Sequence, residues 1–562
     1  MIPDLLHPVL VEATHGLLPA GAVVEPLLPA ANVAHGDYQW NGCMKAAKGM
    51  GTAPRVLAAQ VQARLTHPAL RAVEVAGPGF LNLRLDDAWL ASVVAKQAAD
   101  PNAGVAPDGA GRTVILDYSS PNVAKRMHIG HMRSTHIGSA LDRLHRAAGW
   151  TVVADNHIGD WGTQFGKLIV AWRRWRDDAA FADDPVGELE RLYVRFVAVA
   201  DDDPKLADQA REETAKLQRK DPDNTALWRL FLDVSMKEYE GVYRRMGVRF
   251  DEVLGESAYA DRTDAVVDRL VALGIAEPSE GATIVRFGEK EVMIVRKRDG
   301  ADNYATTDLA CALYRKERWS PARVVYVTDG RQQLHFKQVF HVARQLGVTA
   351  DLVHAWFGTL LLPEGAMSTR RGNVIRLVDL LDEAVRRARA VVDQKSPQLA
   401  DDVRAHIAEA VGVGAVRYAD LSQHPQTNVV FDWERMLSLE GNTAPYLMYS
   451  HARCCSLLAR AAGEGDTVDP AAVAITDPVE RDLALALVRY PEVVAAALVT
   501  MRPNLVTDHL FDLANRLNRF WHDMPVLTGG EHRASRLALV DATRRVLKHG
   551  IESIGLVALE RM

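Results

Sequence analysis

The feature that most constrains the fold of this sequence is a strand, a tight turn and a helix within residues 113–147. Residues Thr113–Tyr118 form a short run rich in apolar and β-branched side chains, which indicates a buried strand. A helical pattern follows over residues 129–147, and a second strand pattern covers Thr151–Ala154. Strand, helix and strand in about 45 residues form a βαβ unit, which predicts a parallel sheet.

Strand patterns return later in the chain, with helical patterns between them. They lie at Ala282–Phe287, Val292–Arg296, Val324–Val327 and Leu352–Phe357. We expect them to complete a doubly wound, Rossmann-type α/β sheet, interrupted by a mostly helical insertion at about residues 165–280.

The two ends of the chain differ from this central part. Residues 1–108 mix helix and strand patterns and end in a loop rich in Gly, Pro and Asp, so we expect an α+β N-terminal domain. Nearly everything after Arg376 reads as helix. The predicted domains are therefore 1–108, a catalytic-type domain at 109–435, and an all-α domain at 436–562.

Composition excludes several classes of protein. The 562 residues include 66 Lys and Arg against 72 Asp and Glu, a formal net charge of −6, which excludes a globally basic coat protein for nucleic acid but not an enzyme with local basic faces. The four cysteines include no CxxC pair, so we expect no zinc or other protein-bound metal site, no disulfide framework and a cytoplasmic location. The longest apolar run, near Val493–Val499, is too short for a membrane span, and we expect no membrane partner.

The segment Pro121–His131 carries the strongest chemical signal. It follows the first predicted strand and opens the helix, where unpaired N–H groups and the helix dipole favour phosphate. Gly130 has no side chain to keep a nucleotide from the backbone, and His128 and His131 can donate to the same phosphate oxygens. Two surface histidines beside a turn are the alternative interpretation, which the position between strand and helix disfavours.

Three further segments, considered together with this motif, are candidate parts of the same binding site. A loop containing Arg370 and Arg371 combines small residues with paired cations, which suits closure over a polyphosphate. Asp308 lies near a helix start, where it is either a site carboxylate or a helix cap. The Gly-rich segment Gly159–Gly166 is expected to be an ordered loop near the strand ends, where ligands of such folds bind.

The motifs together resemble the class I aminoacyl-tRNA synthetases, and among them the arginyl-tRNA synthetases. His128-Ile129-Gly130-His131 matches that family's HIGH signature without substitution, and Asp117–Lys125, Gly159–Gly166, Tyr304–Ala310 and Gln332–Phe336 are similar to arginyl enzymes. The resemblance runs nearly end to end. It includes His35–Asn41 and Gly77–Asn82 in the N-terminal domain, and Asn442–Arg453 with the closing Glu560-Arg561-Met562 in the C-terminal domain.

The sequence departs from the family pattern in three places. The family's KMSKS loop corresponds to Ala366–Arg370, which lacks the first lysine and has arginine for the second. The resemblance implies that Lys125, just before the HIGH motif, substitutes for the missing lysine. Arg126 and Leu559 stand where the family often has proline, and both look tolerable.

The resemblance implies the reaction and the roles of the site residues. Arginine and ATP, with Mg²⁺, would form arginyl-adenylate and pyrophosphate, and the arginyl group would then pass to tRNA(Arg). Catalytic roles fall to Lys125, His128, Gly130, His131, Ser368, Arg370 and Arg371. ATP contacts fall to Pro121, His128, Ile129, Gly130, His131, His335 and Met367. Arginine contacts fall to Asp117, Asn122, Tyr304, Asp308 and Gln332.

The tRNA partner and the rival hypothesis complete these expectations. Tyr446, Tyr449 and Arg453 are candidates to stack on anticodon bases, although one of the tyrosines is expected to belong to a helix-pair core. Family habit implies a monomer. The rival is a non-catalytic paralogue that still binds tRNA, suggested by the missing loop lysine and disfavoured by the intact histidine motif. Length excludes a small HxGH adenylyltransferase, and the absence of zinc-ligand spacing disfavours a cysteinyl enzyme.

Overall fold

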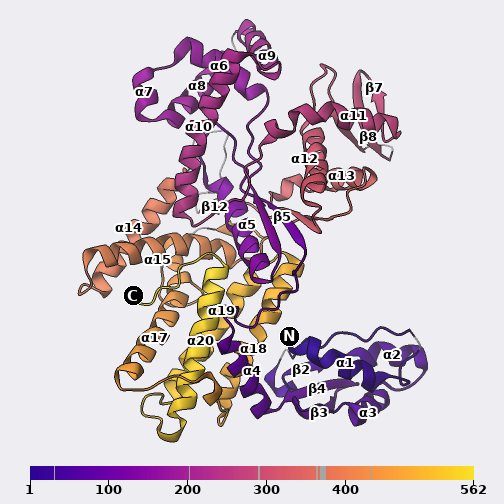
Figure 1. Cartoon of the computed structure of the whole chain (residues 1–562), viewed down its shortest axis with the longest axis vertical. Coiled ribbons are helices and arrows are strands. Elements are labelled where there is room, and N and C mark those ends of the chain that lie inside the picture. The colour runs from indigo at the N-terminus through magenta and orange to yellow at the C-terminus, as the bar shows by residue number, and fades with distance from the viewer. Residues whose placement is uncertain are drawn as a thin grey trace.

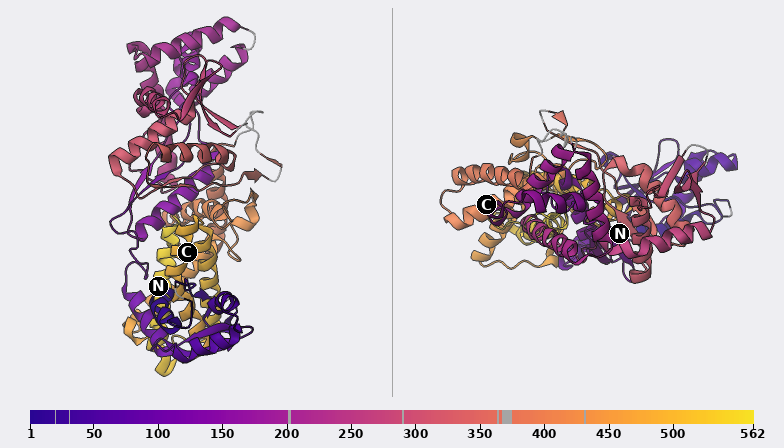
Figure 2. Two further views of the ribbon diagram at one scale, coloured as in Figure 1. Left: turned by 90° about the vertical axis from the view of Figure 1, so that its right-hand side faces the viewer. Right: turned by 90° about the horizontal axis from the view of Figure 1, so that it is seen from above.

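The molecule is long in one direction, with its parallel sheet near the middle (Figure 1). The computed structural model describes residues 1–19, 21–30, 32–200, 203–288, 291–362, 365–366, 375–430 and 432–562. A helical insert and a small antiparallel sheet occupy one end. Both termini lie in the other half (Figure 2).

The central sheet has the order β11-β10-β5-β6, and every neighbouring pair is parallel. Alternate residues of β5 face different cores: Val114 and Leu116 join one cluster of buried side chains, and Ile115 joins the other. A strand buried on both faces needs apolar residues in succession, which is why this run lacks polar alternation. The strands are β5 (Thr113–Asp117), β6 (Thr151–Asp155), β10 (Arg323–Tyr326) and β11 (Asp351–His354).

Helices cover both faces of this sheet, as a doubly wound fold requires. The helix α5 (Ile129–Ala147) contributes Met132 and Leu141 to the first core. The helices α12 (Tyr304–Trp319) and α13 (Gln333–Gln345) face the second core. The 3₁₀ turn η3 (Gly330–Gln332) precedes α13. The predicted doubly wound sheet is confirmed.

The insert leaves the sheet after β6 and is built around its own core, which includes Phe165, Trp172 and Phe231. Its first helix begins at Thr163, so the segment expected to be a loop at 159–166 is a loop only in its first half. Its helices are α6 (Thr163–Trp175), α7 (Asp178–Asp183), α8 (Pro185–Ala200), α9 (Pro204–Gln218) and α10 (Pro222–Arg245).

One sequence prediction about the sheet is wrong. The strands β8 (Ala282–Phe287) and β9 (Glu291–Arg296) exist, but they pair antiparallel with each other and with β7 (Ala276–Ser279) in a separate sheet. Strand patterns identify extended segments without naming their partners, and tight hairpin connections favoured antiparallel pairing here. The 3₁₀ helix η2 (Glu256–Arg262) and α11 (Thr263–Ala272) precede this sheet.

The N-terminal part has the expected α+β structure. Its antiparallel sheet has the order β1-β2-β4-β3, and α4 leads from it toward the central sheet. Its elements are α1 (Ile2–Thr14), β1 (Leu28–Pro29), η1 (Val33–His35), β2 (Tyr38–Trp40), α2 (Gly42–Met50), α3 (Pro54–Arg64), β3 (Leu70–Ala76), β4 (Phe80–Leu85) and α4 (Asp87–Ala99).

The C-terminal part is helical, as expected, after a short sheet of β12 (Leu360–Leu362), β13 (Gly365–Ala366) and β14 (Val429–Val430). Its helices are α14 (Leu377–Lys395), α15 (Asp401–Leu421), α16 (Trp433–Met436), α17 (Ala444–Gly463), η5 (Pro470–Ala472), α18 (Pro478–Thr500), α19 (Asn504–Asp523), η6 (Gly530–His532) and α20 (Arg533–Ser553). By length and composition α18 could cross a membrane, but 61% of its most apolar window is buried, as in the core helix of a helical bundle.

The N-terminal part docks on α18. The Arg481 guanidinium donates to both oxygens of the fully buried Asp37 carboxylate at 2.9 and 2.7 Å, and to Asp87 at 2.6 Å. The Tyr38 hydroxyl donates to Glu492 at 2.7 Å, and burial raises the pKa of Glu492 to about 7. Segments more than 400 residues apart in sequence thus form one packed body.

Candidate active site

The turn between β5 and α5 is held in an unusual backbone conformation at the carboxyl edge of the sheet. Ser119, Ser120 and Ala124 have φ values of 74°, 49° and 62°, which side-chain-bearing residues rarely adopt. Neighbouring groups hold them there: the Ser119 N–H donates to Ser134 Oγ at 2.9 Å, and the Ala124 N–H donates to Ser235 Oγ at 3.0 Å. Strain of this kind is typical of ligand-binding turns.

The two histidines of the motif cap α5. The Gly130 N–H donates to His128 Nδ1 at 3.0 Å, and the His128 N–H donates to His131 Nδ1 at 3.2 Å. A side chain at position 130 would place its Cβ 2.6 Å from a His128 ring carbon, so a larger residue there would displace the His128 ring.

The protonation of both rings follows from this geometry. Burial lowers the pKa of His131 to about 3, and burial with the nearby Lys125 ammonium lowers the pKa of His128. Both imidazoles are therefore neutral at pH 7. Because each Nδ1 accepts a hydrogen bond, each proton sits on Nε2, and both Nε2–H groups remain available as donors.

The segment that follows the predicted cationic loop is attached to this turn. The Ile129 N–H donates to the Ile375 carbonyl at 3.2 Å, and the Leu377 N–H donates to the Met127 carbonyl at 3.0 Å. Residues Met367, Ser368, Arg370 and Arg371 lie outside the described residues. The backbone that leaves their loop is nevertheless anchored beside His128.

Carboxylates gather on the other side of the site. Asp308 lies in the second turn of α12, which Asn303 caps, so the helix-cap interpretation of Asp308 is wrong. His335 Nε2 lies 2.6 Å from Asp308 Oδ2, and the Tyr304 ring centroid lies 4.8 Å from that of His335. Tyr304, Asp308 and His335, all singled out in the sequence, therefore form one group.

Glu256 joins this group and was missed by the sequence reasoning. Burial raises the pKa of Glu256 to about 7; His157 opposes the shift, and the carboxylates of Asp308 and Asp160 add to it. No local motif marks Glu256, because it reaches the site only through the path of η2.

A cavity of about 890 Å³ opens beside these carboxylates. Asn122, Trp161, Glu256, Tyr304 and Thr307 are among its lining residues. Glu256 and aromatic rings line this cavity, and Asp308 directly follows the lining residue Thr307; this end of the cavity suits an elongated cation with an alkyl stem.

Two other predicted arginine ligands have different surroundings. Asp117 is buried at the end of β5, where its Oδ2 accepts from the Arg315 guanidinium at 2.7 Å. Arg315 also donates to Asp155 at 2.7 Å and so fastens α12 to two strands. Gln332 is exposed in η3, and its N–H donates to the Asp329 carbonyl.

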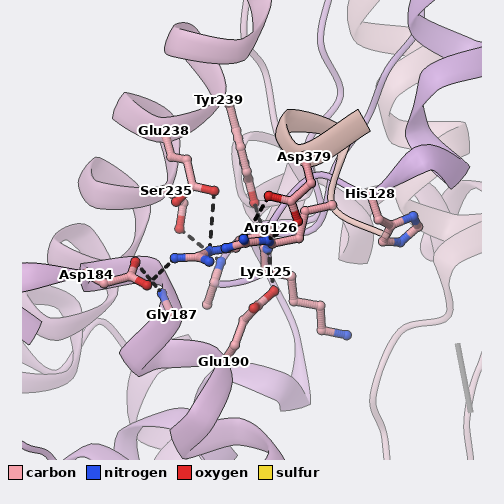
Figure 3. Close-up of polar contacts among 12 residues, drawn as sticks. Lys125, Arg126, His128, Asp184, Gly187, Glu190, Ser235, Glu238, Tyr239 and Asp379 are labelled. Atoms are coloured by element: carbon pink, nitrogen blue, oxygen red, sulfur yellow. Dashed lines mark hydrogen bonds and ion pairs between the residues drawn. The ribbon is translucent and has the colours of Figure 1, made fainter. Parts of the chain in front are cut away.

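Lys125 lies in the turn with its ammonium 4.9 Å from the centre of the Tyr193 ring on α8 (Figure 3 draws Lys125 with the neighbouring Arg126). The positive charge of the Lys125 ammonium contributes to lowering the pKa of both His128 and His131. The side chain thus lies between the insert and the histidine turn.

The predicted anticodon residues separate into core and surface. Tyr446 is buried, and its hydroxyl donates to Asn515 Oδ1 at 2.9 Å, so this tyrosine belongs to the helix core. Tyr449 is 47% exposed. Arg453 stacks over the Trp521 ring at 4.2 Å. Tyr449 and Arg453 remain the surface pair of the three.

A doubly wound parallel sheet whose first turn presents the HIGH motif at a helix start defines a class I aminoacyl-tRNA synthetase. The family model described as tRNA synthetases class I (R), catalytic domain, matches residues 98–433. Those for the arginyl tRNA synthetase N terminal domain and the DALR anticodon binding domain match residues 5–85 and 447–562. The chain belongs to the arginyl-tRNA synthetase family.

Individual relatives agree. The arginine–tRNA ligase of Fusobacterium nucleatum is 44% identical over 542 residues, covering 95% of this chain and 94% of that one. That of Edwardsiella ictaluri is 40% identical over 570 residues, covering 98% of each. The solved arginyl-tRNA synthetases of Plasmodium falciparum and Thermus thermophilus are similar in fold, with TM-scores of 0.85 and 0.83 at 24% and 25% identity, over 99% or more of both chains. Nothing in these findings favours the non-catalytic alternative.

Proposed function

We propose that this chain joins arginine to tRNA(Arg) by way of arginyl-adenylate, with the residues described above in specific roles. The observation that carries the proposal is the pairing of an anionic pocket, at Asp308 and Glu256, with a turn that presents two neutral imidazole donors. The first suits a guanidinium and the second suits a phosphate under attack.

In the first step an arginine carboxylate oxygen attacks the α-phosphorus of ATP, and the bond between the α-phosphorus and the α,β-bridging oxygen breaks to release pyrophosphate. No protein nucleophile is needed, so catalysis consists of positioning and charge stabilisation. The Nε2–H groups of His128 and His131 donate to oxygens of the α-phosphate as charge builds there. Because both rings are already neutral donors, no proton has to move before they act.

The arginine side chain enters the cavity with its guanidinium toward the carboxylates. A guanidinium has five donors and no acceptor, which Asp308 and Glu256 can satisfy together. Tyr304 packs beside the alkyl chain, and Gln332 adds an acceptor. Asp117 and Asn122 receive the α-amino and carboxylate end. Arg315 already holds Asp117 Oδ2 and the Ser120 hydroxyl donates to Oδ1 at 3.3 Å, so the substrate shares Oδ1 with Ser120.

ATP lies along the turn, against Pro121, His128, Ile129, Gly130 and His131, with Met367 and His335 completing its contacts. His335 also touches Asp308, so it stands at the border of the two substrates. Lys125, Ser368, Arg370 and Arg371 face the pyrophosphate. Among the described residues no group of three or more His, Cys, Asp or Glu could hold a metal ion, so Mg²⁺ is taken as part of the ATP complex, bound by phosphate oxygens.

The second step transfers the arginyl group to the terminal adenosine of tRNA(Arg), at the 2′-hydroxyl by class. Tyr449 and Arg453 contact anticodon bases from the C-terminal helices, and Tyr446 supports them from the core. We assign residues 1–108 and 436–562 to tRNA binding and 109–435 to catalysis, with the insertion at about 165–280. The chain acts as a cytoplasmic monomer without a membrane partner.

Two experiments test the proposal. Total tRNA is charged with each amino acid offered separately; the proposal requires arginine alone to be incorporated. Single-turnover arginine activation is then measured for Lys125→Ala, which should be slower by about 10²–10³-fold, because an ammonium aimed at the transition state is lost. Ala366→Lys in that background should restore part of the rate. A Lys125→Ala enzyme within about twofold of wild type would transfer the role to Arg370 and Arg371.

A further inference from the structure

The residue after Lys125 is an arginine enclosed by the helical insert. The Arg126 side chain is 17% exposed. Its Nη2 bonds to Asp184, which ends α7, and its Nε lies 3.8 Å from Glu238 on α10. Figure 3 shows the guanidinium directed between these carboxylates, away from the Lys125 ammonium.

The backbone on both sides of Arg126 is bound to the same helices. The Arg126 N–H donates to Glu190 Oε1 on α8 at 2.5 Å. The Tyr239 hydroxyl of α10 lies 2.6 Å from the Lys125 carbonyl oxygen and 2.7 Å from that of Asn122. The turn that carries Lys125 and His128 is therefore positioned by the insert as well as by the sheet.

The charges around Arg126 are unbalanced without it. Asp184 and Glu238 face one guanidinium, and Glu190 accepts the backbone N–H of the same residue. Burial raises the pKa of Glu238, the Asp184 and Glu190 carboxylates add to the shift, and Arg126 opposes it. Arg376 also contributes positive charge nearby, but its guanidinium already makes two bonds to Asp379, at 2.6 and 2.8 Å.

Lys125 is the other cation carried by this turn, one residue before Arg126. It rests on Tyr193, one helical turn beyond Glu190 on α8, and its four-carbon stem turns about flexible bonds. An unpaired, partly buried carboxylate raises the free energy of the folded state. A cation within reach is therefore expected to pair with it.

We infer that Arg126 is a positioning residue for arginine activation, which neutralises the carboxylates of the insert and so keeps Lys125 free to face the pyrophosphate. This inference rests on the proposed role of Lys125. Arg126 touches no substrate. Its effect passes through the adjacent ammonium and the fixed turn.

The test measures tRNA-saturated, single-turnover arginine activation in the full-length enzyme. Arg126→Met should lower the activation rate constant by about 10²-fold, since misplacing a catalytic group by about 1 Å costs that much. The KM for arginine should stay within about twofold, because the pocket at Asp308 is untouched. In the Lys125→Ala background, Arg126→Met should cause no further loss.

Second-site rescue separates positioning from simple loss of structure. Glu190→Gln keeps an oxygen to accept the Arg126 N–H but removes the charge that would capture Lys125. Combined with Arg126→Met, it should recover about tenfold or more of the rate, since one misdirected charge is removed. Arg191→Met is the matched control: Arg191 pairs with Glu188 on the same helix at 2.6 Å and makes no described contact with the turn. It should lower the melting temperature without changing the rate constant.

Each remaining result decides the question. An equal loss from Arg126→Met with and without Lys125, or no recovery with Glu190→Gln, overturns the inference. A slow Lys125→Ala enzyme beside a normal Arg126→Met enzyme overturns the inference alone. A normal Lys125→Ala enzyme overturns the proposed role of Lys125 as well. If Arg126→Met is insoluble, Arg126→Lys, which keeps the charge and loses the fork, should show a smaller loss that Glu190→Gln does not relieve.

Discussion

Substituting Asp308 with asparagine tests the arginine pocket most directly. The change keeps the shape of the side chain and an acceptor for His335 but removes the negative charge. Asp308 is 19% exposed, so its pairing with a guanidinium takes place largely away from water. Asn cannot offset the cost of burying the substrate's cation.

The size of the effect follows from two opposing terms. Removing one partner of a desolvated charge pair costs about 2–5 kcal/mol. Glu256 offsets part of this, because losing the Asp308 charge lowers the pKa of Glu256 from about 7 and makes Glu256 a more complete anion at neutral pH. We therefore expect about 2–3 kcal/mol, or roughly 30- to 150-fold in kcat/KM for arginine.

The assay is steady-state aminoacylation with arginine and ATP varied separately. The loss should reside in the KM for arginine, with kcat and the KM for ATP nearly unchanged, because the charge acts equally on bound substrate and transition state. Asp261→Asn is the control, since Asp261 lines the cavity that Glu256 lines but pairs with Lys220 at the exposed surface. Near-native kcat/KM for arginine in Asp308→Asn would show that the guanidinium binds elsewhere.

Three further predictions follow from the same site and from the C-terminal helices. Because the pKa of Glu256 is about 7 and its carboxylate is the form that attracts a cation, the KM for arginine should fall as pH rises through 7. Glu256→Gln should flatten that pH profile. An unchanged profile in this variant would show that Glu256 does not contact arginine. Arginine-dependent ATP–pyrophosphate exchange should be weak without tRNA and strong with it, because we expect bound tRNA to complete the site, and robust exchange by the enzyme alone would contradict this. Tyr449→Ala should raise the KM for tRNA by about tenfold, the value of one lost base stack. Tyr446→Phe should lower the melting temperature and leave that KM unchanged. The reverse pattern would show that the anticodon binds elsewhere.

Local sequence patterns correctly predicted those parts of the site whose structure depends on residues close together in the sequence. The strand before the turn and the helix after it were placed within a residue or two, because a continuous apolar run and a capped amphipathic helix each depend on neighbouring residues. The grouping of Tyr304, Asp308 and His335 also followed from motifs on adjacent elements.

The sequence patterns did not predict which distant segments come together in space. Glu256 enters the pocket because η2 passes beside α12, and nothing near it in sequence records that contact. The strands at 282–296 were found but given the wrong sheet, since alternation does not specify a partner. Arg126 looked like a tolerable departure, yet its surroundings come from three helices between 58 and 112 residues away.

The docking of the N-terminal part on α18 has a consequence for how the chain is made. Asp37 and its partner Arg481 are 444 residues apart. At about 5–20 residues per second, roughly 20–90 s pass between the synthesis of one and of the other. During that time the Asp37 carboxylate and the Tyr38 ring of the N-terminal domain lie on a surface that α18 does not yet cover. Association of chaperones with the nascent chain should therefore end with the emergence of residues 478–500 rather than with completion of residues 1–99.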